Sequence, residues 1–238
     1  MIMTDLHMHV VPHVDDGAID MKMSLEMLKM AHEQGVRKVI CTSHSSWQDE
    51  AAVLYHENFE KLRIAAAADL PDMRLYTGCE VLFTGAALPA TLSKLDDGAF
   101  LTLNGTKLVL TEFWPDAPVD EAGQVVNELL SRKYVPVIAH AERCAAFEDE
   151  VFVKRLLEAG ALLQVNMYSL VKESNERIKA RARRMVDARQ VSFVGSDAHG
   201  SNRRPPAVKD GMAYLYEHTD PAYADAVCFG NAEALLHL

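Results

Sequence analysis

Histidine and carboxylate side chains recur at the ends of short apolar runs in this sequence, beginning with the HxH pair His7 and His9. The last run is followed by a DxH pair, Asp197 and His199. Alternate residues of a strand point to the same face, so the members of each pair can reach one ion together. Four intervening runs end in one such residue each, namely His44, Glu80, Glu112 and His140. Because these residue types are common ligands of divalent metals, the pattern predicts a metal site.

Seven strand-like apolar runs must position these side chains. They are Ile2–His7, Val36–Thr42, Met73–Cys79, Lys107–Glu112, Val135–His140, Ala161–Val165 and Val191–Gly195. All but the sixth deliver a histidine or a carboxylate at the C-terminal end, whereas the sixth is followed by Asn166, which is polar but uncharged. Amphipathic stretches with helical periodicity separate the runs, at about 24–34, 50–69, 120–133, 148–159 and 174–188.

The alternation of strands and helices predicts an α/β fold. Strands separated by helices imply parallel β/α units, and about seven such units favour a closed or nearly closed barrel, forming a single domain over residues 1–238. The C-terminal strand ends of such a barrel converge on its catalytic face, which would bring the metal-site residues together. A doubly wound open sheet is the alternative, although the phosphate-binding fingerprints GxGxxG and GxxxxGK[ST] are both absent.

The remaining segments are less regular. Residues 81–106 contain Gly, Pro and Asp-Asp-Gly turns and are predicted to form an inserted loop with one short helix. A helix is expected after Pro205 and Pro206, and another after Asn231, a residue type suited to an N-cap. The basic stretch 177–189 favours a solvated helix face over a site for an acidic partner.

Composition restricts the class of protein. The chain has 238 residues, of which 49% are hydrophobic, and this is enough for a packed core and excludes an intrinsically disordered chain. Its 34 acidic residues outnumber the 24 Lys and Arg, so a formal net charge of -10 disfavours nonspecific binding to nucleic acid or anionic membranes. The four cysteines are scattered, no secretory signal is visible and no long apolar run occurs. We therefore expect a reduced cytoplasmic protein that does not insert into a membrane.

The motifs, taken in order, resemble those of the PHP (polymerase and histidinol phosphatase) superfamily. They are Asp-Leu-His-Met-His, Val-Asp-Asp-Gly-Ala, Thr-Ser-His, Gly-Cys-Glu, Thr-Glu-Phe, Ile-Ala-His-Ala-Glu-Arg and Gly-Ser-Asp-Ala-His-Gly. Val-Asp-Asp-Gly-Ala, His-Ala-Glu-Arg and Arg-Pro-Pro further resemble the bacterial capsule-type protein-tyrosine phosphatases, the CpsB/YwqE-like group. The resemblance covers the chain from His7 to Pro206 and implies a distorted seven-stranded, TIM-like β/α barrel.

The resemblance also implies three divalent metal ions, with manganese expected first and iron or zinc as alternatives. The implied ligands are His7, His9 and Asp197 for one ion, Glu80, Glu112 and His140 for a second, and Asp16, His44 and His199 for the third. Glu80 would bridge the first two ions. Asp15 remains an alternative to Asp16, because spacing alone cannot separate adjacent aspartates.

Such a site suits the hydrolysis of phosphate monoesters. Three divalent ions outweigh four carboxylate ligands, and the resulting positive cavity attracts a group that carries nearly two negative charges. Clustered ions also lower the pKa of bound water and stabilise both the attacking and the leaving oxygens of an in-line displacement. Arg143 and Arg204 are predicted to hold the phosphate oxygens as bidentate donors. In the competing interpretation each arginine only pairs with a neighbouring acid such as Glu142, and Arg203 competes with Arg204 for its role.

The resemblance implies a protein-tyrosine phosphatase whose partner is a phosphotyrosine protein, a bacterial tyrosine kinase that controls capsular or exopolysaccharide synthesis. No cysteine is followed six positions later by an arginine, which excludes the C-x5-R nucleophile loop of cysteine-based enzymes. Trp47 and Trp114 closely follow predicted ligands and could stack on the phosphotyrosine ring, with ordinary loop packing as the alternative. The competing functions are a small-molecule phosphatase of the histidinol-phosphatase type, a nuclease and a non-enzymatic, metal-dependent regulator. The net charge of -10 and the lack of a basic channel disfavour the nuclease.

Overall fold

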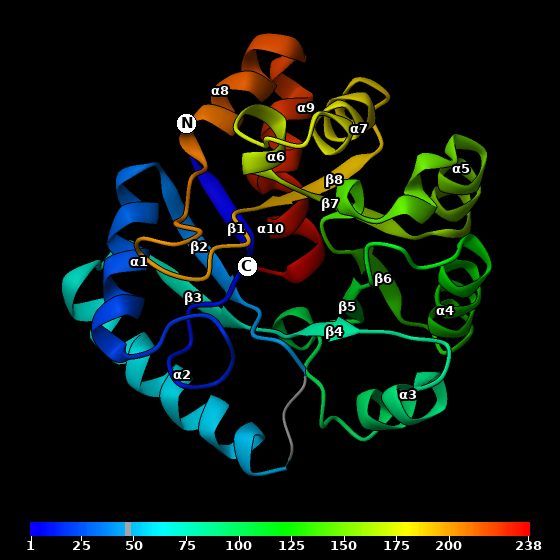
Figure 1. The fold of residues 1–238 in the computed structure, drawn as a ribbon. Coiled ribbons are helices and arrows are strands. Elements are labelled where there is room, and N and C mark those ends of the chain that lie inside the picture. Colours follow the sequence, from blue (N-terminus) through cyan, green and yellow to red (C-terminus); the bar gives the residue numbers. More distant parts are fainter. Residues whose placement is uncertain (46–48) are drawn as a thin grey trace.

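Parallel β/α units form two adjoining sheets surrounded by helices (Figure 1). The computed structural model describes residues 1–45 and 49–238, with side chains for all of these except 49–53. The strands are β1 Met3–Met8, β2 Val36–Cys41, β3 Arg74–Thr77, β4 Glu80–Leu82, β5 Leu108–Glu112, β6 Val135–Ile138, β7 Leu162–Asn166 and β8 Val191–Gly195. The longer helices are α1 Met21–Glu33, α2 Asp49–Asp69, α3 Leu88–Asp96, α4 Val119–Ser131, α5 Glu150–Ala159, α7 Glu176–Asp187 and α8 Lys209–His218. The shorter helices are α6 Met167–Val171, α9 Pro221–Asp225 and α10 Asn231–Leu236.

The two sheets meet at the C-terminal ends of their strands. One sheet has the order β1-β2-β3 and the other β4-β5-β6-β7-β8, and the described strand pairs are all parallel. At one seam, His9 N donates to Ala198 O at 3.0 Å, which links the ends of β1 and β8. At the other seam, Ser45 N donates to Glu80 O at 2.8 Å, which links the chain after β2 to β4. The predicted α/β class with parallel β/α units is confirmed, and these bonds bring the strand ends to one rim.

The third predicted strand, Met73–Cys79, corresponds to β3, and directly after it the chain passes to the other sheet. β3 ends at Thr77 and pairs with β2, whereas Glu80 begins β4, which pairs with β5. A Cβ placed on the intervening Gly78 would lie 3.0 Å from Ile40 Cγ2 and 3.1 Å from Leu103 Cδ2. The bare backbone of Gly78 therefore fits where the chain passes from one sheet to the other. The predicted run Met73–Cys79 therefore supplies β3 alone, and β4, which begins at Glu80, was not predicted as a strand.

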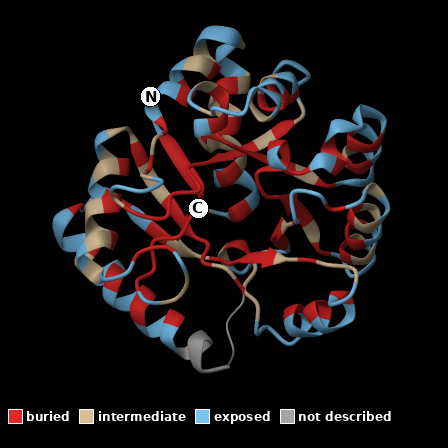
Figure 2. Cartoon of the chain, viewed as in Figure 1, coloured by how far each residue is buried: buried red, intermediate tan, exposed pale blue. Residues whose placement is uncertain are grey.

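The outer helices pack apolar faces against the sheets. α1 begins after Asp20, whose carboxylate accepts a hydrogen bond from Met23 N, and it ends before Gly35, whose φ of +101° suits glycine. α4 buries four residues at helical spacing, Ala122, Val125, Val126 and Leu129. Figure 2 shows the resulting pattern, with buried positions on the strands and inner helix faces and exposed positions outside. The predicted helices at about 24–34, 50–69, 120–133, 148–159 and 174–188 correspond to α1, α2, α4, α5 and α7.

A separate apolar cluster joins α10 to the strands. Its buried members are Leu6, Ile40, Leu103, Leu108, Leu110, Val137, Ala139, Phe193, Ala232 and Leu236. Asn231 Nδ2 donates to Ser192 O at 2.9 Å, and Lys38 Nζ lies 2.8 Å from Glu233 Oε1. These contacts hold α10 at the N-terminal ends of β8 and β2, and in Figure 1 α10 lies at the centre of the ring of strands. α10 therefore covers the strand ends on the side opposite the predicted metal site.

The C-terminal helices only partly match the prediction. α8 follows Pro206 as expected, but Asn231 is not an N-cap, because the chain stays helical from α9 through Ala226–Gly230 into α10. Asp220 caps α9 instead, accepting a hydrogen bond from Tyr223 N at 2.9 Å. The predicted loop 81–106 contains the expected helix, α3, together with the end of β4. No helix within residues 1–45 and 49–238 combines the length and the hydrophobicity needed to span a lipid bilayer.

Candidate metal centre

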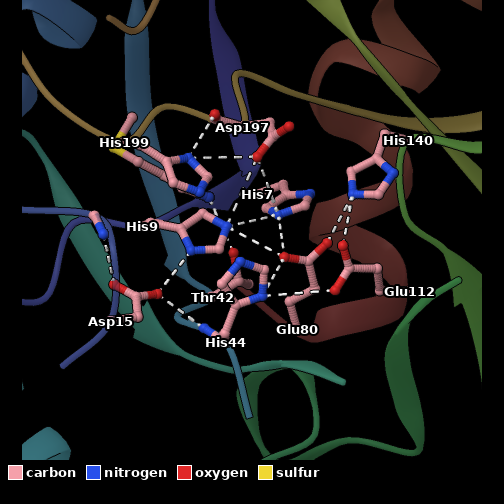
Figure 3. A network of polar contacts seen from close by, with 12 residues as sticks. His7, His9, Asp15, Thr42, His44, Glu80, Glu112, His140, Asp197 and His199 are labelled. Atoms are coloured by element: carbon pink, nitrogen blue, oxygen red, sulfur yellow. Dashed lines mark hydrogen bonds and ion pairs between the residues drawn. The ribbon is translucent and has the colours of Figure 1, made fainter. Parts of the chain in front are cut away.

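The histidines and carboxylates predicted from the strand ends lie together at one rim of the two sheets. The nine predicted ligands are His7 and His9 at β1, Asp16 in the following loop, His44 after β2, Glu80 in β4, Glu112 in β5, His140 after β6, and Asp197 and His199 after β8. Figure 3 shows eight of them, all except Asp16, pointing toward one another. Parallel strands explain the convergence, because their C-terminal ends share one rim.

Glu80 lies at the centre of this cluster. It is 1% exposed, and its Oε2 lies 3.2 Å from His7 Nε2, 3.3 Å from His9 Nε2 and 3.1 Å from His44 Nδ1. Its other oxygen, Oε1, lies 2.9 Å from His140 Nε2. Glu112 also faces His140 and His44. Its Oε1 lies 3.7 Å from His140 Nε2, and its Oε2 lies 3.6 Å from His44 Nδ1. The two oxygens of Glu80 thus face different imidazole rings, an arrangement that the predicted bridging role of Glu80 requires.

Asp197 and Asp16 complete the cluster on the other side. Asp197 Oδ1 lies 3.6 Å from His7 Nε2, 3.7 Å from His9 Nε2 and 3.6 Å from His199 Nδ1. Asp16 Oδ1 lies 3.5 Å from His199 Nε2 and 3.6 Å from His44 Nε2. The loop after β1 therefore supplies a carboxylate that faces residues from two other strand ends.

Four overlapping groups of donors have ligand atoms within 4.8 Å of one another. They are His9, Asp16, His44 and His199; His7, Glu80 and His140; His7, His9 and Asp197; and His44, Glu80 and Glu112. His7 Nε2 and His9 Nε2 are only 3.0 Å apart, and the buried His199 Nε2 has no hydrogen-bond partner among the described residues. Facing lone-pair donors of this kind are what a cation requires, and mixed imidazole and carboxylate donors suit manganese, iron or zinc. The residues therefore fit the metal group that the sequence pattern implies.

Asp15 and Asp16 take different places. Asp15 Oδ2 lies 2.7 Å from His9 Nδ1 and accepts a hydrogen bond from His44 N at 2.9 Å, while Asp15 Oδ1 accepts one from Gly17 N at 3.0 Å. These contacts hold a ring and a loop from outside the cluster. The geometry thus favours Asp16 over Asp15 as the ligand and gives Asp15 the task of orienting His9.

Two uncharged residues of β7 support the cluster and were not predicted as site residues. Gln164 Oε1 accepts a hydrogen bond from His140 N at 2.8 Å and lies 3.2 Å from His7 Nδ1. Asn166 Nδ2 donates to Asp197 Oδ2 at 2.9 Å. The only sequence feature that pointed to them was the polar end of the sixth apolar run. It did not predict a site, because glutamine and asparagine are not typical metal ligands. Neutral amides in these positions fix the direction of rings and carboxylates.

Burial and neighbouring charge shift the pKa values of several of these groups. Burial, followed by the charge of Glu80, raises the pKa of Glu112 to about 7. Burial lowers the pKa of His140, but the hydrogen bond and charge of Glu80 outweigh it and raise that pKa to about 9. Burial and the neighbouring His9 lower the pKa of His199 to about 4. Such divergent shifts within one cluster are typical of functional sites.

Both predicted arginines lie against the cluster. Arg143 Nη1 is 3.1 Å and Arg204 Nη2 is 2.6 Å from Asp197 Oδ2. Neither arginine pairs with Glu142, whose buried Oε1 instead accepts a hydrogen bond from Asn166 N at 3.1 Å. The side chains of Arg143 and Arg204 are 40% and 41% exposed, so the remaining donors of their guanidinium groups are available to a ligand.

A cavity of about 180 Å³ opens onto the cluster and the arginines. Its lining includes His44, Glu112, Trp114, His140, Arg143 and Arg204. Trp114 is 53% exposed and therefore contributes to the mouth of this cavity. Trp47 lies outside the described residues.

Comparison with known proteins agrees with this description. The family model "Capsular polysaccharide synthesis, CpsB/CapC" matches residues 3–237. The chain is 32% identical to the tyrosine-protein phosphatase YwqE of Bacillus subtilis over 98% of this chain and 91% of that protein. It is 28% identical to the tyrosine-protein phosphatase CpsB of Streptococcus agalactiae over 98% of each.

Solved structures show the same relationship. A crystal structure from work on YwqE of Bacillus subtilis and CpsB of Streptococcus pneumoniae, described as unique metal-dependent tyrosine phosphatases, superposes with a TM-score of 0.87 at 30% identity. The match covers 99% of this chain and 94% of that one. The phosphotriesterase homology protein of Escherichia coli shares the fold at a TM-score of 0.60 and 10% identity. The family model spans almost the whole chain, and the chain accordingly belongs to the CpsB/CapC capsular polysaccharide synthesis family.

Proposed function

We propose that this chain is a metal-dependent protein-tyrosine phosphatase that removes phosphate from a bacterial tyrosine kinase in capsular or exopolysaccharide synthesis. The main support is the cluster of nine histidine and carboxylate side chains that could bind metal, with two half-exposed arginines beside it. The names of the family relatives support the activity and the link to capsule synthesis. The proposal includes three divalent ions, manganese foremost, a single domain over residues 1–238, and action in the cytoplasm.

The nine donors divide naturally among several ions. His7, His9 and Asp197 form one group, and Glu80 connects it to His140. His9 and His199 also belong to the group around Asp16, which supports a third position. Bound there, divalent ions would supply positive charge beside a phosphate ester and lower the pKa of water.

The arginines of the chain would bind and orient the ester. Arg143 and Arg204 approach the same oxygen of Asp197 and therefore stand next to each other at the cavity wall. Two planar guanidinium groups in this arrangement can donate to two oxygens of one phosphoryl group. Their charge would hold the dianion against the cluster, and their geometry would fix the direction of the leaving oxygen.

The tyrosine leaving group reduces the need for an acid. A phenol has a pKa of about 10, so a phenolate departs with less protonation than an alkoxide requires. The task of the chain's residues is then to position the ester and to balance its charge.

Metal analysis followed by parallel assays tests this function. The purified protein, loaded with manganese, iron or zinc, is assayed on a phosphotyrosine peptide, on histidinol phosphate and on a single-stranded oligonucleotide. We expect more than one ion per chain and preferential hydrolysis of the peptide. Less than one ion per chain after loading would overturn the metal site, and preference for histidinol phosphate would replace the tyrosine phosphatase by a small-molecule phosphatase.

A further inference from the structure

A larger cavity adjoins the candidate metal centre. Its volume is about 460 Å³, against about 180 Å³ for the cavity at the cluster. Arg143, Asp197 and Arg204 belong to the walls of both cavities, so the two cavities adjoin at the arginines. Other residues that line the larger cavity are Asn166, Tyr168, Lys172, Glu173, Pro205 and Ala207.

Asp197 has a different chemical environment on each of its two oxygens. Its Oδ1 faces imidazole rings, including His7 at 3.6 Å. Its Oδ2 accepts hydrogen bonds from Arg143, Arg204 and Asn166, all of which line the larger cavity. A phosphoryl group held between the arginines and the cluster therefore borders the larger cavity on its arginine side.

We propose that the larger cavity binds the aromatic ring of the substrate's phosphotyrosine and that Tyr168 stacks on this ring. The inference rests on the proposed phosphatase function and assigns the place of the leaving group. The cavity at the cluster has room for a phosphoryl group, whereas the larger cavity falls in the range of about 300–1,000 Å³ that is typical of organic ligands. The two volumes thus match the two parts of an aryl phosphate.

Tyr168 has the properties of a stacking partner. It lies in α6, two residues after Asn166, so α6 follows directly on the polar end of β7. The side chain is 42% exposed, and its ring has no aromatic or cationic partner among the described residues. Pro205 and Ala207 add apolar surface to the same cavity.

The charges of the cavity also favour a ring over a second phosphate. Lys172 Nζ lies 2.7 Å from Asp210 Oδ2, so its charge is balanced by a neighbour. Glu173 adds a negative charge to the lining. Away from the two arginines, then, the cavity is not basic, and a neutral aromatic group fits it better than a second anion.

Trp114 is the competing partner for the ring, because it lines the smaller cavity from the other side. The manganese-loaded protein therefore needs to be compared with Tyr168→Ala, Tyr168→Phe and Trp114→Ala. For each variant, KM and kcat are measured on a phosphotyrosine peptide, and the inhibition constant is measured for inorganic phosphate, which lacks the ring. Metal content is measured in parallel.

Stacking predicts a selective effect. Tyr168→Ala should raise KM for the peptide about 2- to 12-fold, the range expected from the energy of an aromatic pair, and leave inhibition by phosphate within about twofold. Tyr168→Phe should recover most of the loss, because it keeps the ring. A rise of KM in Trp114→Ala but not in Tyr168→Ala would overturn the inference, and so would an equal loss of phosphate inhibition in Tyr168→Ala. A wild-type protein that binds metal but does not hydrolyse the peptide would instead overturn the phosphatase function itself.

Discussion

Asp15 Oδ2 lies 2.7 Å from His9 Nδ1, on the side of the ring that faces away from the cluster. The contact selects the imidazole tautomer in which Nε2 is free to bind a cation. Burial raises the pKa of Asp15, but the hydrogen bond and the charge of His9 outweigh this effect. The pKa of Asp15 therefore lies well below its ordinary value. Asp15 is therefore a carboxylate that stays charged in order to orient a ligand.

Replacing Asp15 tests this relationship. Asp15→Asn should weaken metal binding about 10- to 100-fold, because His9 Nδ1 loses its charged partner although His9 Nε2 still faces the cluster. Titration with manganese, followed by metal analysis, measures the change. Asp187→Asn is the matched control, since Asp187 is an exposed aspartate of α7. Equal affinity in both variants would contradict the orienting role.

The two arginines are expected to act on the substrate and not on the metal. Arg204→Ala and Arg143→Ala should each lower kcat/KM about 10- to 100-fold, the loss expected for hydrogen bonds between charged groups. Metal content should stay at the wild-type level. Arg203→Ala is the matched control, because Arg203 is the adjacent arginine and has no contact with Asp197 in the described structure. Unchanged kinetics in Arg204→Ala would remove that residue from the site.

Arg181 is expected to hold the turn that carries Arg143. It is 5% exposed, and its Nη1 donates to the backbone oxygens of Glu142 and Cys144, on either side of Arg143. Arg181→Met would leave these acceptors without their donor and should reduce the free energy of unfolding by about 1–3 kcal/mol. It should also raise KM, because Arg143 would lose its support.

Chemical denaturation and steady-state kinetics measure the two effects of Arg181→Met. Arg184→Met provides the control on the same helix, since Arg184 is 44% exposed and pairs with Glu150 at 3.1 Å. An exposed pair of this kind contributes about 0–1 kcal/mol. Equal stability and equal KM in the two variants would show that the buried arginine does not support the turn.

Removal of metal should destabilise the fold. A cation that binds only the folded chain stabilises it by about 2.7 kcal/mol when its free concentration is 100 times Kd. For a chain of this size that corresponds to a shift in Tm of about 5–10 °C. We expect a chelator to lower Tm and manganese to restore it. Restoration by magnesium to the same extent would contradict a site rich in imidazole donors.

The sequence predicted the parts of this molecule that repeat with a simple period. His7 and His9 were found because alternate residues of a strand share a face, and His140 because parallel strands place their C-terminal ends at one rim. The family resemblance supplied Asp16, and the structure places it beside His199. Their role as ligands stays a prediction that metal analysis must test.

Other features depend on contacts that no local pattern contains. Gln164 orients His140 only because β7 lies next to β6, and an amide at a strand end carries no signal of that role. Arg181 lies in a basic stretch that predicts a solvated face, yet its partners come from a turn 39 and 37 residues away along the chain. The division between β3 and β4 depends on how closely Ile40 approaches Gly78.

The position of α10 has a consequence for biosynthesis. Leu236 packs in the same apolar cluster as Leu6, so the first strand and the last helix complete one core. A ribosome-bound chain that still lacks residues 231–236 would lack Ala232 and Leu236, and the remaining members of this cluster would be more exposed to water. We expect the chain to complete this core only after α10 has been synthesised, and the exposed apolar surface to favour aggregation until then.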